Sequence, residues 1–186
     1  MSGPDTPQSE ANAPMSVSAS ISAADETQRA LLERLWLMFR HDMSEFRQIL
    51  PGTDGTFRSD RLDAALGDPG WAVYVLRYGD NPAGFALVRG LDEPRRVINS
   101  FFVVRGARRS GFGRAAVRAL VSEHPGGWSV AFQDSNTKAV AFWRSVAEDL
   151  APGAWTEVRR PVPGQPDLPP DVWIEFSAGN AAASGS

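Results

Sequence analysis

Residues 97–123 read VINSFFVVRGARRSGFGRAAVRALVSE, and this stretch predicts three elements in a row. Residues 97–104 are dense in β-branched and aromatic side chains, which is typical of a buried strand. Residues 105–113 then bring three arginines and three glycines together. After them, Val117, Leu120 and Val121 share one face at helical spacing. The stretch therefore predicts a strand, a basic loop and a helix.

The basic loop predicts an anion-binding site. The first turn of a helix has N–H groups without intrahelical partners and a partial positive charge, and both favour phosphate. Gly111 and Gly113 have no Cβ, so a ligand is able to lie close to the backbone. Arg108, Arg109 and Arg114 add full positive charges. The alternative is a plain turn whose arginines are solvated.

The spacing of the loop excludes two familiar phosphate-binding motifs. A P-loop carries Lys and then Ser or Thr directly after its last glycine, whereas an arginine and an alanine follow Gly113. A dinucleotide-binding turn needs a third glycine where this chain has Ala116. The pattern that remains is Arg108-x-x-Gly111-x-Gly113.

This pattern, preceded by a strand with Phe102 and Val103 near its end, resembles the acetyl-CoA loop of the GNAT N-acetyltransferase family. A second segment, Asn136-x-x-Ala139-x-x-Phe142-Trp143, resembles the family's Asn-x-x-Ala-x-x-Phe-Tyr helix. The resemblance covers roughly residues 25 to 176. It implies an α/β (α+β) GNAT fold, with a central mixed, mostly antiparallel sheet, two splayed parallel strands, and helices on both faces.

The resemblance also implies acetyl-CoA as a co-substrate, with no metal. Backbone groups of Phe101 and Val103 would pair with the pantetheine arm, and the Val103 N–H would polarise the thioester carbonyl. On their own, two aromatic side chains on one helix are more typical of a core. The residues expected to bind the cofactor are Phe101, Phe102, Val103, Arg108, Arg109, Gly111, Phe112, Gly113, Arg114, Asn136, Phe142 and Trp143.

The implied activity is direct acetyl transfer to a primary amine of a small molecule. Many GNAT members carry a carboxylate just before the aromatic pair of the strand and a tyrosine on the late helix. This chain has Asn99 and Ser100 at the first place and Trp143 at the second, so its acid and base are not the usual ones. The candidate catalytic residues are His41, Glu45 and Ser100, and the candidate substrate-binding residues are His41, Asp42, Glu45 and Asn99.

The first helix leaves its own alternatives open. His41 has an intrinsic pKa suited to proton transfer, and the carboxylates of Asp42 and Glu45 would suit a cationic acceptor. The same side chains could simply form a solvated face. Two other functions are compatible with the chain: a catalytically weak GNAT-fold sensor of acyl-CoA, and a non-enzymatic α/β domain that binds an acidic partner protein through its arginines.

The composition narrows the class of protein. The chain has 186 residues, 42% of them apolar, and a formal net charge of -3, which suits one globular domain and no nucleic-acid partner. It has no cysteine and only two histidines, so disulfides and a metal site are not expected. Without a secretion signal or a membrane span, a cytoplasmic protein is expected. A homodimer is compatible with these features.

The chain divides into three parts. Residues 1–22 and 178–186 are small and polar and are predicted to be flexible tails. The GNAT domain is expected over residues 23–177, with a first helix from about residue 25. Leu31, Leu35 and Met38 are predicted to centre the buried stripe of that helix. Further strands are predicted at 71–77, 83–89, 128–132, 155–160 and 171–176, and further helices at 60–66 and 137–150.

Overall fold

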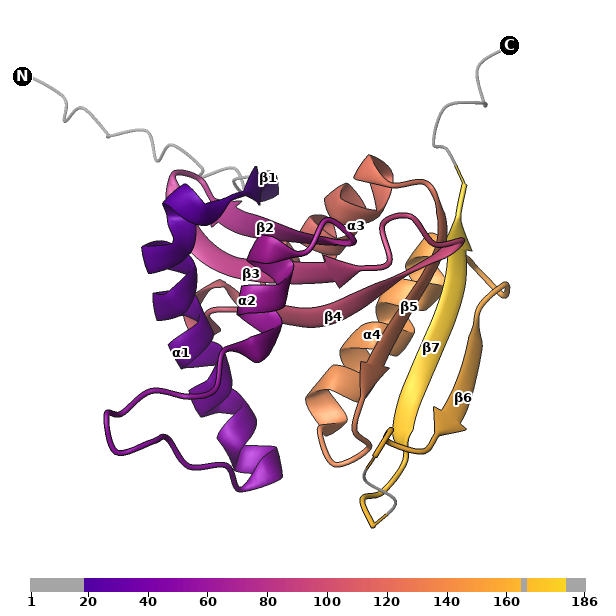
Figure 1. Cartoon of the computed structure of the whole chain (residues 1–186). Helices are drawn as coiled ribbons and strands as arrows, with labels where there is room; N and C mark the ends of the chain where they lie inside the picture. The colour runs from indigo at the N-terminus through magenta and orange to yellow at the C-terminus, as the bar shows by residue number, and fades with distance from the viewer. Residues whose placement is uncertain (1–18, 165–166, 180–186) are drawn as a thin grey trace, which may run out of the picture.

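The strands of the chain form one sheet in a computed structural model that describes residues 19–164 and 167–179 (Figure 1). Within these residues the strand order is β1-β2-β3-β4-β5-β7-β6. The β4–β5 pair is parallel and the other pairs are antiparallel, which confirms the expected mixed sheet. The strands are β1 (Ala19–Ala24), β2 (Trp71–Tyr78), β3 (Asn81–Arg89), β4 (Arg95–Val103), β5 (Gly126–Phe132), β6 (Thr156–Arg160) and β7 (Asp171–Ala178).

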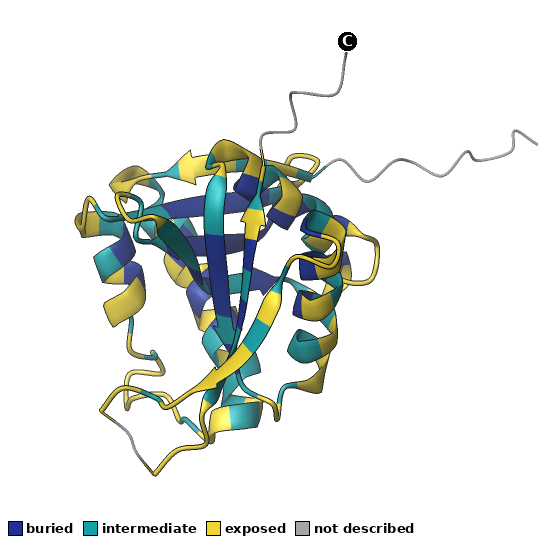
Figure 2. Ribbon diagram, turned by 90° about the vertical axis from the view of Figure 1, so that its right-hand side faces the viewer, coloured by how far each residue is buried: buried dark blue, intermediate teal, exposed yellow. Residues whose placement is uncertain are grey.

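Helices cover both faces of this sheet. They are α1 (Arg29–Arg47), α2 (Asp60–Gly67), α3 (Phe112–Glu123) and α4 (Thr137–Leu150), with short 3-10 turns η1 (Glu26–Gln28) and η2 (Arg105–Ala107). Side chains along a strand alternate between faces, so Val73 and Val75 of β2 pack with α1 and α2, whereas Tyr74 and Leu76 pack with α3 and α4. Figure 2 shows the buried strands between the helices. No helix in the described ranges has the length and apolar character needed to cross a bilayer.

The folded part begins earlier than the sequence indicated. β1 starts at Ala19 and pairs antiparallel with β2 from Ala19–Tyr78 to Ala24–Val73. Its sequence, ASISAA, consists mostly of small side chains and gives almost no apolar signal. An edge strand of this kind is held mainly by backbone hydrogen bonds to its neighbour, which the sequence pattern does not reveal. At the other end, Ala178, the first residue of the predicted C-terminal tail, is the last residue of β7 and pairs with Gly126. Residues 1–18 and 180–186 of the predicted tails lie outside the described residues.

The buried face of α1 is turned relative to the expected one. Leu35 is buried as expected, but Met38 is 43% exposed and Leu31 is only half-buried. Trp36 and Phe39 are buried instead and lie 5.9 Å and 5.6 Å, centroid to centroid, from the Phe85 ring of β3. Two large aromatic side chains bury more apolar area than a leucine and a methionine, so they determine the rotation of the helix.

The two parallel strands separate halfway along their length. β4 and β5 pair from Arg95–Gly127 to Ile98–Val130, and no pair follows in the described residues. β4 nevertheless stays paired with β3 as far as Val103, and β5 stays paired with β7 as far as Phe132. The two strands therefore diverge after Ile98 and leave an opening in the middle of the sheet (Figure 1).

Gly84 on β3 lies so close to β4 that replacing it should lower the stability of the fold strongly. A Cβ on Gly84 would lie 2.0 Å from the Phe102 carbonyl oxygen, which belongs to the paired backbone and cannot move away. We expect Gly84→Ala to lower the free energy of unfolding by about 2–3 kcal/mol in urea titrations. The matched control is Gly67→Ala, where a Cβ meets nothing within 4 Å and a slight gain is expected. Equal stability of the two variants would contradict the close approach of β3 and β4.

Candidate functional site

The open edge of β4 presents backbone groups to the opening. The Val104 N–H donates to the Ala83 carbonyl at 2.8 Å, so Val104 faces β3. Backbone polar groups alternate sides along a strand, and the N–H and C=O groups of Phe101 and Val103 therefore point away from β3. Arg108 Nε donates to the Val103 carbonyl at 2.7 Å, which agrees with that orientation. The Phe101 groups and the Val103 N–H remain available to a ligand.

The loop after β4 ends in the free N-terminus of α3. Gly111 is the N-cap residue, in the left-handed region at φ 83°, and Arg109 is also left-handed at φ 67°. The Ala115 N–H donates to the Gly111 carbonyl at 3.0 Å. The N–H groups of Phe112, Gly113 and Arg114 thus have no partner inside the helix. A positive φ at a residue other than glycine costs free energy and is a frequent mark of a functional loop.

The arginines of the loop do not all point at this N-terminus. The Arg105 and Arg108 side chains both bond Asp42 of α1. Burial tends to raise the pKa of Asp42, but the hydrogen bonds from Arg108 and Arg105 outweigh it and hold the pKa below its ordinary value. Asp42 therefore ties α1 to the loop as a charged carboxylate.

The other loop arginines behave differently. Arg114 Nη2 donates to Ser145 Oγ at 2.7 Å, and Nη1 lies 3.0 Å from Asp149 Oδ2. Arg114 is thereby held against α4, and only its backbone N–H faces the helix N-terminus. Among residues 19–164 and 167–179, Arg109 has no carboxylate within 4 Å, so it is the loop cation free to meet an anionic ligand.

The helix on the other side of the opening carries the second sequence motif. Asn136 is the N-cap residue of α4, and its Oδ1 accepts from the Ala139 N–H at 3.1 Å. Phe101 of β4 stacks on Phe142 at 5.8 Å and meets the Trp143 ring edge-to-face at 5.4 Å. Gly113 lies directly beside this pair, since a Cβ there would be in van der Waals contact with the Phe142 ring at 3.4 Å. The aromatic pair therefore bridges the opening and also belongs to the core.

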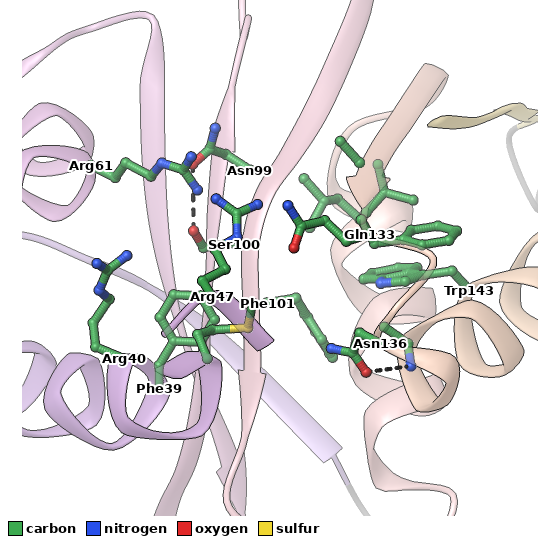
Figure 3. A pocket seen from close by; sticks show the side chains of 16 residues that line it. Phe39, Arg40, Arg47, Arg61, Asn99, Ser100, Phe101, Gln133, Asn136 and Trp143 are labelled. Carbon is green, nitrogen blue, oxygen red and sulfur yellow. Dashed lines mark hydrogen bonds between the residues drawn. The ribbon is translucent and has the colours of Figure 1, made fainter. Parts of the chain in front are cut away.

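A pocket of about 130 Å³ lies in the opening, between α1 and α2 on one side and α4 on the other (Figure 3). Ser100, which is only 4% exposed, accompanies Asn99 and Phe101 on its β4 wall, and the Ser100 hydroxyl donates to Asn99 Oδ1 at 3.4 Å. Its lining consists of Phe39, Arg40, Met43, Arg47, Arg61, Ile98, Asn99, Ser100, Phe101, Val130, Ala131, Phe132, Gln133, Asn136, Ala139 and Trp143.

The pocket brings together some of the candidate residues and leaves others out. Asn99 and Ser100 line it. His41 and Glu45 are exposed on α1 and Asp42 faces the loop arginines; these three do not line it. Within the described part of the chain, the lining holds no aspartate, glutamate, histidine or tyrosine.

Sequence reasoning missed the polar side chains that the pocket does contain, Arg40, Arg47, Arg61 and Gln133. Arg40 and Arg47 are seven positions apart on α1, a spacing that places them on one helix face. That spacing could have indicated that the two arginines lie together, but it does not show that this helix face lines a pocket. Figure 3 shows the three arginines on the α1 and α2 side, opposite Asn136 and Trp143.

Comparisons with known proteins give a consistent result. The sequence profile of the acetyltransferase (GNAT) family matches residues 31–147. The fold resembles an acetyltransferase from Thermus thermophilus, with a TM-score of 0.63, 17% identity, and 87% of this chain and 97% of that chain covered. No curated protein sequence matches significantly.

Two further solved structures share the fold. For the ribosomal-protein-S18-alanine N-acetyltransferase of Escherichia coli, the TM-score is 0.59 at 15% identity, covering 91% of this chain and 99% of that chain. For an Arabidopsis thaliana protein in complex with the bisubstrate analogue CoA-Ac-MVNAL, the TM-score is 0.57 at 13% identity, covering 87% of this chain and 99% of that chain. At such low identity these likenesses concern the fold alone.

Proposed function

This chain belongs to the acetyltransferase (GNAT) family, and on that premise we propose that it transfers the acetyl group of acetyl-CoA to a primary amine of a small molecule. The observation that carries the proposal is the separation of β4 from β5 after Ile98 and Val130. This separation leaves the backbone edge of β4 free after Ile98, and the loop that follows β4 leads to the N-terminus of α3.

The residues around the opening suit acetyl-CoA. The N–H groups of Gly113 and Arg114, together with the Arg109 cation, provide donors for a pyrophosphate at the N-terminus of α3. A Cβ on Gly111 would meet nothing within 4 Å, so no other part of the described chain crowds the backbone at this glycine. The backbone groups of Phe101 would pair with an amide of the pantetheine arm. Asn136 and Trp143 would border its thiol end, since both line the pocket.

The reaction that follows is a direct substitution. The acetyl-CoA thioester supplies an activated acyl group: the amine nitrogen forms a C–N bond to its carbonyl carbon, and the C–S bond breaks to release CoA. The Val103 N–H would donate to the carbonyl oxygen as negative charge develops there. The pocket walls would hold the amine beside that carbon, and this proximity supplies much of the rate.

Protons would move through water in this scheme. The ammonium must lose one proton before attack, and the nitrogen loses a second one as the thiolate takes one up, so the transfer balances. Ser100 is the candidate catalytic side chain that lines the pocket, and its hydroxyl would relay protons between waters. His41 and Glu45, exposed on α1, would act only through water. With no carboxylate, histidine or tyrosine in the described pocket lining, we expect kcat/KM to rise with pH along the deprotonation of the acceptor itself.

The same missing side chains favour a second candidate function, a GNAT-fold protein that binds acyl-CoA as a sensor with little turnover. A domain without an acid or a base in its pocket could hold the cofactor and respond to it. The two candidates share CoA binding and differ in the release of free CoA when amines are present.

Calorimetric titration with acetyl-CoA and, separately, with CoA tests the proposal. We expect micromolar dissociation constants, about -8 kcal/mol. Release of free thiol is then measured with a panel of small amines, a lysine peptide and a free peptide N-terminus. Turnover with a small amine supports the enzyme, and binding without turnover of any amine supports the sensor. Lack of binding at millimolar concentration would remove both and leave a domain that binds a partner protein.

A further inference from the structure

Three arginines gather on one side of the pocket, from two helices. Arg40 and Arg47 lie seven positions apart on α1, and Arg61 is the second residue of α2. All three line the pocket together with Asn99 and Ser100 of β4 (Figure 3). An arginine in the first turn of a helix faces the positive end of the helix dipole, so Arg61 is not placed there for the stability of α2.

These three charges are not neutralised by protein carboxylates. Among the described residues, Arg40, Arg47 and Arg61 have no carboxylate oxygen within 4 Å, whereas Arg29 on α1 and Arg58, just before α2, are ion-paired. The Nε atom of Arg40 is buried and has no hydrogen-bond partner in the described residues. Its guanidinium lies 5.8 Å from the Trp36 ring and also 5.8 Å from that of Phe57, so its immediate neighbours are aromatic.

The charges also act on one another. Desolvation and the nearby charges of Arg47 and Arg40 lower the pKa of the Arg61 guanidinium. Desolvation and the charges of Arg47 and Arg58 lower the pKa of Arg40 as well, and the nearby charge of Asp60 opposes them. Asp171 at the start of β7 opposes the effect on Arg61 but does not reach ion-pair distance. A bound anion would offset the electrostatic repulsion among these three positive charges.

The arginines do not belong to the cofactor loop. The side chains of Ser100 and Phe102 point to the α1 and α2 face of the sheet, where Phe102 packs. The cofactor loop leads into α3, and the Phe142 and Trp143 pair belongs to α4; both helices cover the opposite face. An anion at the arginines would therefore enter from the side opposite to the CoA phosphates and meet the thioester in the opening.

We propose that Arg40, Arg47 and Arg61 form an anion-binding wall, and that the acceptor is a primary amine that also carries a carboxylate or a phosphate group. This rests on the proposed function, since it assigns the substrate class of that site. A guanidinium is the side chain best suited to a carboxylate or phosphate, because its N–H groups match two oxygens at once. The wall and the opening share one small pocket, so the anionic group lies a few bonds from the amine.

The proposal replaces the idea of a cationic acceptor. That idea rested on Asp42 and Glu45, but Asp42 is bonded to Arg105 and Arg108 and neither residue lines the pocket. A polyamine would instead bring its second charge to three arginines.

Matched amines test this in the protein saturated with CoA, which blocks the cofactor phosphate site and prevents turnover. The pairs are β-alanine with β-alaninamide, and O-phosphoethanolamine with ethanolamine. We expect the anionic member of at least one pair to bind at least tenfold more tightly in calorimetric titrations. The pair that discriminates distinguishes carboxylate from phosphate. Equal binding within both pairs, or no binding of either anionic amine at millimolar concentration, would overturn the proposal.

Variants assign the effect to the wall. Arg47→Gln and Arg61→Gln are each expected to weaken the binding of the preferred anionic amine by about tenfold or more. The binding of its partner without the anionic group, and of CoA, is expected to stay unchanged. Arg34→Gln removes the same charge from an exposed position of α1 outside the pocket and is expected to change nothing. A fall in CoA affinity in the Arg47 or Arg61 variant would assign these arginines to the cofactor and overturn the proposal. If wild-type protein fails to bind CoA, the proposed function is lost, and the pairs are titrated into free protein to judge the wall separately.

Discussion

Gly111→Asp is expected to weaken the binding of CoA by about a hundredfold, while Gly111→Asn stays within a few-fold of the wild type. Gly111 caps α3 at φ 83°, where aspartate and asparagine are the side chains that tolerate the left-handed region best. A Cβ at this position meets no protein atom within 4 Å, so both side chains have room. The two variants therefore fold alike and differ in one negative charge.

The magnitude follows from the position of that charge. Two unit charges about 4 Å apart near a protein surface repel by about 4 kcal/mol before screening by salt, and screening leaves about 2–3 kcal/mol. The measurement is calorimetric titration of both variants, with thermal melts as the control for folding. An equal loss in both would point to backbone strain, and no loss in either would remove the loop as the phosphate site.

Gly113 is the weaker position for this test. A Cβ there would already be in van der Waals contact with the Phe142 ring at 3.4 Å, so an aspartate would also press on the contact between α3 and α4. A loss of affinity at Gly113 would not separate charge from packing.

The fold followed from the sequence wherever burial was strong. Residues 97–123 form a strand, a loop and a helix as predicted, because apolar residues such as Ile98 and Leu120 alternate or repeat at periods that only one element satisfies. β1 gave no such signal, since its pairing with β2 uses backbone groups that every sequence has. The rotation of α1 could not be predicted from the spacing of its apolar residues either. The spacing allows several buried faces and does not show that Trp36 and Phe39 meet Phe85.

The site was predictable in its backbone and not in its side chains. Glycine spacing indicated the helix N-terminus, because only particular residues adopt the conformation found at Gly111. The arginine side chains, by contrast, are long, and tertiary neighbours decide where they end. Arg108 turns back to Asp42 and Arg114 lies against α4, although both stand in the loop motif. Arg61 joins Arg40 only through the packing of α2 beside α1, which no local pattern contains.

Val103→Pro is expected to lower kcat by about 10²- to 10³-fold with the best acceptor. The substitution removes one N–H, the donor proposed to meet the developing oxyanion, and loss of one such donor has an effect of this size. The sheet should tolerate it, because the Val103 N–H faces the opening and the neighbouring ladder bond from Val104 to Ala83 is kept. Phe102, the residue before the new proline, is already in extended strand conformation, as proline requires.

Two controls isolate the N–H of Val103 from its side chain and from the sheet. Val103→Ala keeps the N–H and shortens the side chain, so stability should fall with kcat nearly unchanged. Val104→Pro removes the bond to the Ala83 carbonyl and should destabilise the sheet. CoA affinity in Val103→Pro should fall by no more than about tenfold, because CoA has no acetyl carbonyl for this N–H to meet and a single hydrogen bond is worth about 1 kcal/mol. A folded Val103→Pro protein with wild-type kcat would place the polarising donor elsewhere, since a backbone N–H that is absent cannot stabilise the transition state.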